Sequence, residues 1–266
     1  MKVHDCTILF NEIDLLELRL NTLNDVVDHF VIAEAECSHQ NKPKPLYFQE
    51  NRERFKKFED KITYIVVPAE EFTDDSWANE RHQTESTFKG IQDADPEDTL
   101  LVGFLDEIPD PKDVKEYHES ERGLVSNLQK FYIYYLNTRF NHRHSPTLTH
   151  PFFRGTTFLT RKMVTPETYY DTMMVGRQGD GVLEVEGGWH FTFLGDGLNA
   201  FTKIQNYGHT EFNHIPEDYL KHCFDNLSDP LCRGDAAVFS HLEPEELLPE
   251  YVLKNKAKYS KYLRPY

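Results

Sequence analysis

One stretch of the sequence, residues 100–110, reads Leu100-Leu101-Val102-Gly103-Phe104-Leu105-Asp106-Glu107-Ile108-Pro109-Asp110. An unbroken apolar run of strand length is typical of a strand that is buried on both faces of an α/β sheet. The run stops at two adjacent carboxylates, Asp106 and Glu107, and the prolines that follow prevent the strand from continuing. Open α/β sheets bind ligands at the carboxyl ends of their strands, and hard oxygen ligands suit Mg²⁺ or Mn²⁺ carrying a diphosphate. A strand that merely runs into an acidic turn is the equally weighted alternative.

The composition is that of a globular chain with a strongly acidic balance. Of the 266 residues, 39% are hydrophobic and 13% aromatic, which is enough for a substantial core. The 45 acidic and 29 basic residues give a formal charge of −16, so we expect no nucleic-acid partner. No apolar run approaches the roughly 20 residues of a membrane span, and the chain opens without a basic-then-apolar leader. Four scattered cysteines match no zinc spacing and indicate free thiols, so we expect a cytoplasmic protein.

Short apolar runs alternate with a helical pattern along the first hundred residues. Strands are expected near residues 7–10, 30–33 and 62–67, and a helix from Ile13 to Leu23 with Asn11 as its cap. Together with residues 100–105, this alternation predicts an α/β fold with a mainly parallel central sheet flanked by helices. We therefore expect Asn11, Glu34 and Asp106 to lie at the same edge of that sheet.

Two basic side chains beside these strand ends are candidates for contact with phosphate. Lys44 lies in a stiff loop, residues 40–48, that contains two prolines, and Arg81 lies in a helical stretch that begins at Trp77. A guanidinium group matches phosphate oxygens bidentately. A solvated loop and an ordinary surface salt bridge are the respective alternatives.

The second half of the chain carries more aromatic residues and glycines. We expect an aromatic-rich helix over residues 123–136, a strand at 156–160 and a glycine-rich mobile lid at 176–188. The segment Trp189–Leu194 precedes Asp196, which fits the N-cap of a helix from about Leu198 to Asn206.

Six blocks of sequence, in order over nearly the whole chain, resemble glycosyltransferase family 17, which contains the β-1,4-mannosyl-glycoprotein 4-β-N-acetylglucosaminyltransferases. The blocks are Asp5…Phe10-Asn11-Glu12…Arg19-Leu20, Val27-Asp28-His29-Phe30-Val31-Ile32…Glu34, Lys42-Pro43-Lys44-Pro45-Leu46-Tyr47-Phe48, Asp106-Glu107-Ile108-Pro109, Gly187-Gly188-Trp189-His190-Phe191 and Leu248-Pro249…Tyr251-Val252-Leu253-Lys254-Asn255. The resemblance implies a GT-A fold in a single domain over residues 1–266. A nucleotide-sugar half, about 1–110, would merge with an acceptor half, about 111–245, followed by a C-terminal tail, about 246–266.

The same resemblance implies the activity and its site. It implies an inverting transfer of a sugar, with GlcNAc from UDP-GlcNAc favoured, to a glycan or other hydroxyl acceptor, assisted by Mn²⁺ or Mg²⁺. The expected metal ligands are Asp106, Glu107 and His209, because His209 matches the family's late histidine better than His190 does. Contacts with the nucleotide-sugar are expected from Asn11, Glu12, Glu34, Lys44, Arg81, Asp106, Trp189 and His190.

The sequence departs from the family at the central site. Where the family has Asp-any-Asp, this chain has Phe104-Leu105-Asp106, and an aromatic ring cannot serve as an oxygen ligand. Glu107 or Asp110 would have to compensate. Two other functions therefore stay open: a metal-dependent phosphodiesterase or pyrophosphatase, and an inactive module that binds a nucleotide or glycan.

An inverting transferase also needs a carboxylate that takes the proton of the attacking hydroxyl. The candidates near the Trp-His segment are Asp180, Glu184, Glu186 and Asp196. Asp180 would arrive only when the glycine-rich loop closes, and the two glutamates alternate with apolar residues as on the solvent face of a strand. Asp196 is held between two glycines at a helix start, and we favour it as the base.

Overall fold

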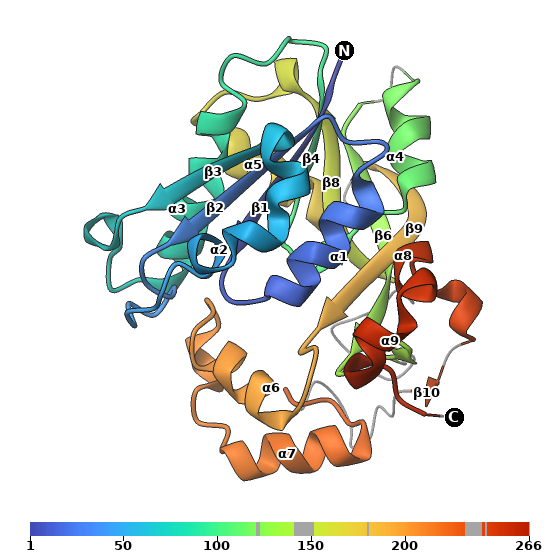
Figure 1. Ribbon diagram of the computed structural model, residues 1–266. Coiled ribbons are helices and arrows are strands. Elements are labelled where there is room, and N and C mark those ends of the chain that lie inside the picture. Colours follow the sequence, from blue (N-terminus) through green and yellow to red (C-terminus); the bar gives the residue numbers. More distant parts are fainter. Residues whose placement is uncertain (121–122, 141–151, 180, 232–240, 243, 266) are drawn as a thin grey trace.

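In the described part of the chain, ten strands form one sheet in the order β10-β7-β6-β8-β4-β1-β2-β3, with β9 pairing to β5 and β6. Figure 1 shows how this sheet runs through the molecule. The computed structural model describes residues 1–120, 123–140, 152–179, 181–231, 241–242 and 244–265. The strands are β1 (Val3–Leu9), β2 (His29–Ala35), β3 (Ile62–Val67), β4 (Thr99–Val102), β5 (Glu107–Ile108), β6 (Val125–Ile133), β7 (Thr138–Arg139), β8 (Phe153–Thr160), β9 (Leu183–Thr192) and β10 (His241–Leu242).

The first half of the sheet is parallel, as its sequence predicts. Strands β3, β2, β1 and β4 lie side by side with every neighbouring pair parallel. Strand β4 is buried on both faces, because Leu101 belongs to one apolar cluster and Leu100 to another. It ends at Val102, earlier than expected, because a turn closed by the Glu107 N–H and the Phe104 carbonyl begins at once.

Helix α1 (Ile13–Leu23) has the predicted bounds, but Asn11 does not cap it. The residue at the cap position is Glu12, which makes no side-chain capping bond to the helix. Its carboxylate instead accepts hydrogen bonds from the backbone N–H groups of Phe10 and Asn11. The loop between β1 and α1 is therefore held by Glu12.

The second half of the sheet is mostly antiparallel. Strand β8 is antiparallel to β4 and to β6, while β9 runs parallel to β6. The predicted α/β fold with helices around a central sheet is confirmed. The sheet is mixed, because outside the first half the parallel pairing among the described strands is that of β6 with β9, so the expectation of a mainly parallel sheet holds for the first half. The helix expected over residues 123–136 is wrong, because Val125–Ile133 forms the buried strand β6 between β8 and β9. β-Branched and aromatic residues pack well on a pleated surface, and here pairing with distant strands decides the conformation.

The glycine-rich segment at 176–188 is not a loop throughout. It contains the end of helix α5 (Tyr169–Gln178) and the start of β9, and residue 180 lies outside the described part of the chain. Gly188 has a φ of 84°, and a Cβ there would lie 2.4 Å from the Ile108 carbonyl oxygen. This glycine lets β9 approach β5 closely, so its role is structural.

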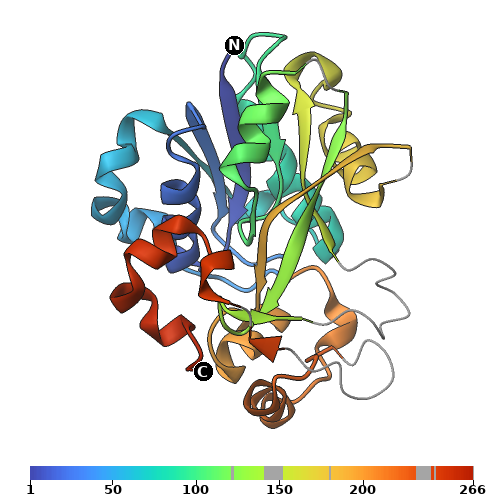
Figure 2. The same ribbon diagram turned by 90° about the vertical axis from the view of Figure 1, so that its right-hand side faces the viewer.

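Helices cover both faces of the sheet. Helix α1 lies on one face beside α8 (Glu250–Lys254) of the C-terminal segment, drawn in red in Figure 2, and α9 (Lys256–Tyr259) follows. Helices α3 (Ser76–Ser86) and α5 pack on the other face. The remaining helices are α2 (Tyr47–Glu50), α4 (Pro111–His118), α6 (Gly197–Ile204) and α7 (Glu217–Asn226), the last two forming a separate apolar cluster near the end of β9. In the described part of the chain, no helix has both the length and the apolarity to cross a membrane.

A buried arginine joins α1 to the turn that follows β4. The Arg19 side chain is 0% exposed and donates through Nε and Nη2 to Asp5 of β1, at 2.8 and 2.6 Å. Its Nη1 donates to the carbonyl oxygens of Phe104 at 3.0 Å and Glu107 at 2.6 Å. Since Asp106 lies between those two carbonyls, Arg19 fixes the backbone that carries it.

We expect Arg19→Met to lower the free energy of unfolding by about 3–5 kcal/mol, because it leaves the Asp5 carboxylate buried without its partner. Urea unfolding followed by circular dichroism measures this loss. The control is Arg52→Ala, whose exposed pair with Glu59 should contribute about 0–1 kcal/mol. Equal losses in the two variants would contradict the role given to Arg19.

Candidate active site

A pocket with a cavity volume of about 370 Å³ opens at the carboxyl ends of β1 and β4. That size is within the range of small-molecule sites. Its walls come from distant parts of the chain, including the loop after β1, helix α3, the turn between β4 and β5, strand β9 and helix α6. The polar side chains among them include Glu12, Lys44, Glu80, Gln83, Asp106, Glu107, Arg177, His190, Lys203 and His209.

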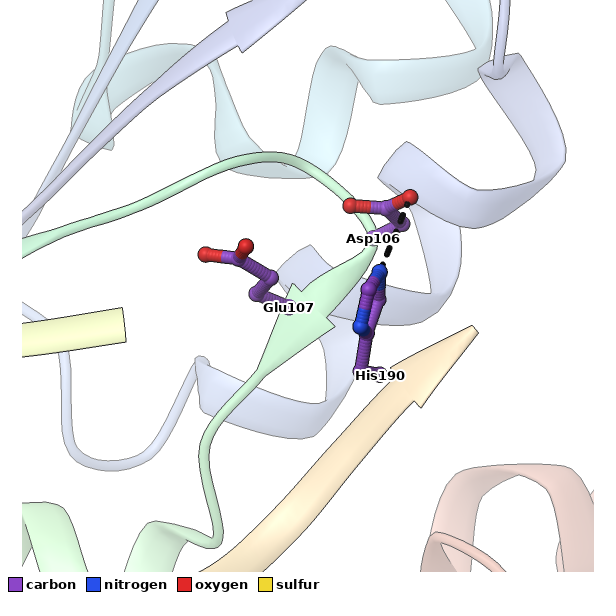
Figure 3. Close-up of side chains that lie close together, drawn as sticks. All are labelled: Asp106, Glu107 and His190. Atoms are coloured by element: carbon purple, nitrogen blue, oxygen red, sulfur yellow. Dashed lines mark ion pairs between the residues drawn. The ribbon is translucent and has the colours of Figure 1, made fainter. Parts of the chain in front are cut away.

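Asp106 lines this pocket and pairs with two side chains. Its Oδ2 is 2.6 Å from Nζ of Lys203 on α6 and 3.4 Å from Nε2 of His190 on β9 (Figure 3). Burial favours the neutral acid, but the charges of Lys203 and His190 outweigh it and hold the pKa of Asp106 well below its usual range. Burial likewise opposes the charge of Lys203, yet Asp106 raises the pKa of that ammonium group. The pair is therefore ionised at neutral pH.

Glu107 is held by Arg177 of α5. Both of its carboxylate oxygens accept from Nη1 of Arg177 at 2.7 Å, and Oε2 also accepts from the Phe104 N–H at 3.0 Å. The guanidinium lies 4.8 Å from the centre of the Phe104 ring, a cation–π distance. Phe104 stands where the resemblance implies an aspartate. Instead of supplying a ligand oxygen, its ring packs against the Arg177 guanidinium.

Glu34 is absent from the described pocket lining, but it binds Lys44, which belongs to that lining. Its fully buried carboxylate accepts from Lys44 Nζ at 2.8 Å, the Tyr64 hydroxyl at 2.8 Å, and the backbone N–H groups of Tyr47 and Phe48. Burial lowers the pKa of Lys44, with the pairing to Glu34 opposing the shift. Lys44 lines the pocket with Glu34 as its anchor, and its contact with a nucleotide-sugar stays a prediction.

Asp106, Glu107 and His190 each offer a ligand atom, and these atoms lie within 4.8 Å of one another. Carboxylate oxygens suit Mn²⁺ or Mg²⁺, and Nδ1 of His190 is buried without a hydrogen-bond partner among the described residues. This donor set is compatible with a divalent cation, which would share the carboxylates with Lys203 and Arg177. Within the described residues the histidine of the group is His190, whereas Nδ1 of His209 pairs with Glu211 at 2.6 Å and His209 lies elsewhere on the pocket wall.

The other residues expected to contact a nucleotide-sugar are divided between the pocket and its surroundings. Glu12 lines the pocket. Asn11 is exposed outside the described lining, and Arg81 pairs with Glu85 and Asp171 on the surface. Trp189 faces away from its neighbour His190 because side chains alternate along β9, and its Nε1 donates to the Leu247 carbonyl at 2.7 Å.

The candidate bases are only partly described. The Asp196 carboxylate caps α6 by accepting from the Asn199 N–H at 2.9 Å and lies outside the described pocket lining. Asp180 lies outside the described residues. Glu184 pairs with Arg154, and Glu186 lies on the same exposed part of β9. The assignment of Asp196 as the proton acceptor therefore stays a prediction.

Sequence reasoning missed three charged residues of the pocket lining: Glu80, Arg177 and Lys203. The Glu80 side chain is 13% exposed, with Oε2 4.0 Å from Nδ1 of His39, and burial raises its pKa to about 7 while Arg177 acts to lower it. Glu80 could have been found from the helical stretch that begins at Trp77. Residues three apart share one face of a helix, so Glu80 lies on the same face as Trp77. Lys203 offered no such signal, because its partner Asp106 is 97 positions away in the sequence.

Comparisons with known proteins give a match to one family profile, to curated relatives and to a solved structure. The sequence profile described as Glycosyltransferase family 17 matches residues 1–258. The human and rat proteins named Beta-1,4-mannosyl-glycoprotein 4-beta-N-acetylglucosaminyltransferase are 31% identical to this chain over 109 residues, 37% of this chain and 20% of each relative. The match thus spans one fifth of the length of these curated relatives. Among solved structures, the glycosyltransferase GlyE of Streptococcus pneumoniae TIGR4 aligns with 99% of this chain and 65% of its own, at 14% identity and a TM-score of 0.37.

We expect Glu80→Gln to change how stability depends on pH. The folded state raises the Glu80 pKa from 4.5 to about 7, so its stabilising effect is complete below 4.5 and is lost as the pH rises through 7. Relative to wild type, the variant should gain up to about 3 kcal/mol of unfolding free energy between pH 4.5 and 8. Urea titrations at several pH values measure the difference. Parallel pH profiles would contradict it, and Glu53→Gln, on the surface, is the control with no expected change.

Proposed function

This chain belongs to glycosyltransferase family 17, and on that premise we propose that it transfers a sugar from a nucleotide-sugar to a hydroxyl acceptor. One observation carries the proposal. In a chain with a formal charge of −16, the pocket gathers Lys44, Arg177 and Lys203 at the carboxyl edge of the sheet. Such a group of cations matches the diphosphate of a nucleotide-sugar.

The proposed donor is UDP-GlcNAc and the proposed acceptor is a glycan or another hydroxyl compound. The choice of GlcNAc is supported by the names of the curated relatives, which are N-acetylglucosaminyltransferases. The β-mannosyl glycoprotein in those names is the relatives' acceptor. The cytoplasm is the proposed location.

Mn²⁺ or Mg²⁺ would be held by Asp106, Glu107 and His190, and when bound such an ion neutralises charge on a departing diphosphate. The chain's own cations face the same place. Lys203 and Arg177 are fixed by Asp106 and Glu107, so they stabilise negative charge there without having to reorganise. The proposed chemistry is direct displacement at the anomeric carbon with inversion.

A carboxylate of the chain then takes the proton of the attacking hydroxyl. Asp196 is the base proposed from the sequence. Glu80 is the second candidate, because it lines the pocket and its pKa of about 7 suits a group that accepts and releases a proton near neutral pH.

We expect UDP-GlcNAc to raise the melting temperature of the wild-type protein, and to raise it further with Mn²⁺, because a ligand that binds the native state stabilises it. Lys203→Met should weaken UDP-GlcNAc binding by about tenfold through the loss of a charge-assisted contact. Asp106→Asn should remove the effect of Mn²⁺. The matched control is Lys162→Met, an exposed lysine paired with Glu97 outside the described pocket lining. A wild-type protein that no nucleotide-sugar stabilises would refute the proposed function.

Turnover separates this function from its alternatives and the two bases from each other. Sugar release that rises with acceptor concentration indicates transfer; nucleotide hydrolysis without sugar indicates a phosphodiesterase; tight binding without turnover indicates an inactive module.

We expect Asp196→Asn to lower turnover by about a hundredfold or more with donor affinity unchanged. If the variant only melts earlier, Asp196 is a helix cap, and a selective loss of turnover in Glu80→Gln would transfer the role to Glu80.

A further inference from the structure

One face of helix α3 forms a wall of the pocket. Trp77, Glu80 and Gln83, spaced three residues apart, all line it. Gln83 fixes the helix, because its amide donates to the carbonyl oxygens of Leu9 at 3.2 Å and Ala33 at 2.9 Å. The helix therefore presents Trp77 and Glu80 to the pocket from a rigid support.

Trp77 offers an apolar surface that the fold leaves open. Its side chain belongs to the pocket wall, yet the residue is 44% exposed. The indole meets the His209 ring edge-on, with the ring centres 4.4 Å apart. A large aromatic surface left exposed in a pocket is suited to ligand contact.

Gly208 brings the indole and the Glu80 carboxylate together. A Cβ at Gly208 would lie 3.1 Å from Cε3 of Trp77 and 3.2 Å from Oε2 of Glu80, so both side chains pack against this backbone. The Ser76 hydroxyl anchors the same residue by donating to the Gly208 carbonyl at 2.6 Å. Trp77 and Glu80 thus form one surface, in which the apolar indole ring lies beside the Glu80 carboxylate, a hydrogen-bond acceptor.

We propose that Trp77 and Glu80 form a subsite for a pyranose ring. The indole packs against the apolar C–H face of the sugar, and the Glu80 carboxylate accepts hydrogen bonds from its hydroxyl groups. A pyranose carries several hydroxyl donors around an apolar face, whereas a uracil ring would direct carbonyl oxygens as well as its one N–H at an acidic group.

The electrostatic neighbours of Glu80 place this subsite beside the cations. Arg177 and Lys203 both act on the Glu80 carboxylate, and they are the cations assigned to the diphosphate. The subsite rests on the proposed function, which supplies two sources of a pyranose: the sugar of the donor and the acceptor. Both the donor sugar and the acceptor would place a hexose ring beside the bound diphosphate.

The test compares the binding of UDP, UDP-GlcNAc and methyl β-N-acetylglucosaminide to wild type, Trp77→Leu and Glu80→Gln by ligand-observed NMR. Glu85→Gln, on the same helix but outside the described pocket lining, is the matched control. We expect UDP affinity to stay within about twofold in Trp77→Leu and in the control, and not to fall in Glu80→Gln, because that variant removes a negative charge near Arg177 and Lys203. UDP-GlcNAc affinity should fall about tenfold in both pocket variants if the subsite holds the donor sugar. If it holds the acceptor, only the glycoside should lose affinity.

The wild-type protein also provides an optical readout of the subsite. The chain has two tryptophans, and Trp189 is buried with its Nε1 donating to Leu247, so the solvent-accessible emission comes from Trp77. Added glycoside should shift that emission and protect it from acrylamide quenching.

Two results would overturn the proposal: UDP affinity that falls as far as UDP-GlcNAc affinity in Trp77→Leu, or sugar affinities that change in neither pocket variant. The first would mean that the indole holds the nucleobase. A wild-type protein that binds the glycoside through Trp77 but binds no nucleotide-sugar would refute the transferase and retain the subsite.

Discussion

The buried contact of Arg19 with Asp5 and the carbonyl oxygens of Phe104 and Glu107 is the constraint on which the site depends. It joins the first strand, the first helix and the turn that follows β4. Removing a guanidinium group from water is costly, and the contact is tolerated only because a carboxylate and several carbonyls replace the lost hydration. The consequence is a turn whose backbone cannot move without breaking its hydrogen bonds to a buried guanidinium group.

An acid paired with a base recurs three times at the pocket, and two of the acids, Asp106 and Glu107, belong to that turn. Asp106 pairs with Lys203, Glu107 with Arg177, and Glu34 with Lys44. In each pair the basic group lines the pocket and the carboxylate fixes its position. The carboxylates that looked like direct ligands in the sequence are therefore, first of all, supports for three cations.

Phe104, which stands where the family resemblance implies an aspartate, belongs to the same arrangement. Phe104 lies beneath the Arg177 guanidinium, and Gly103 leaves room for the Glu107 carboxylate, since a Cβ there would be 2.8 Å from its Oε2. The ring and the glycine together let one glutamate and one arginine fill the space beside Asp106. With both carboxylates already neutralised by internal cations, the charge balance of the pocket differs from that of a purely acidic metal site.

Local chemistry in the sequence determined the first half of the fold and the acidic end of β4. The helix from Ile13 to Leu23 and the parallel strands follow from short-range periodicity, and the resemblance to the family rests on residues that are neighbours in the chain. The tertiary structure alone decided that residues 125–133 form a strand, because their pairing with β8 and β9 outweighs any local preference. It also decided that His190, not His209, lies with Asp106, and that Lys203 meets Asp106 across 97 positions of sequence. Contacts between distant segments depend on how the sheet brings those segments together. A pattern of neighbouring residues carries no information about which distant segment will lie beside it.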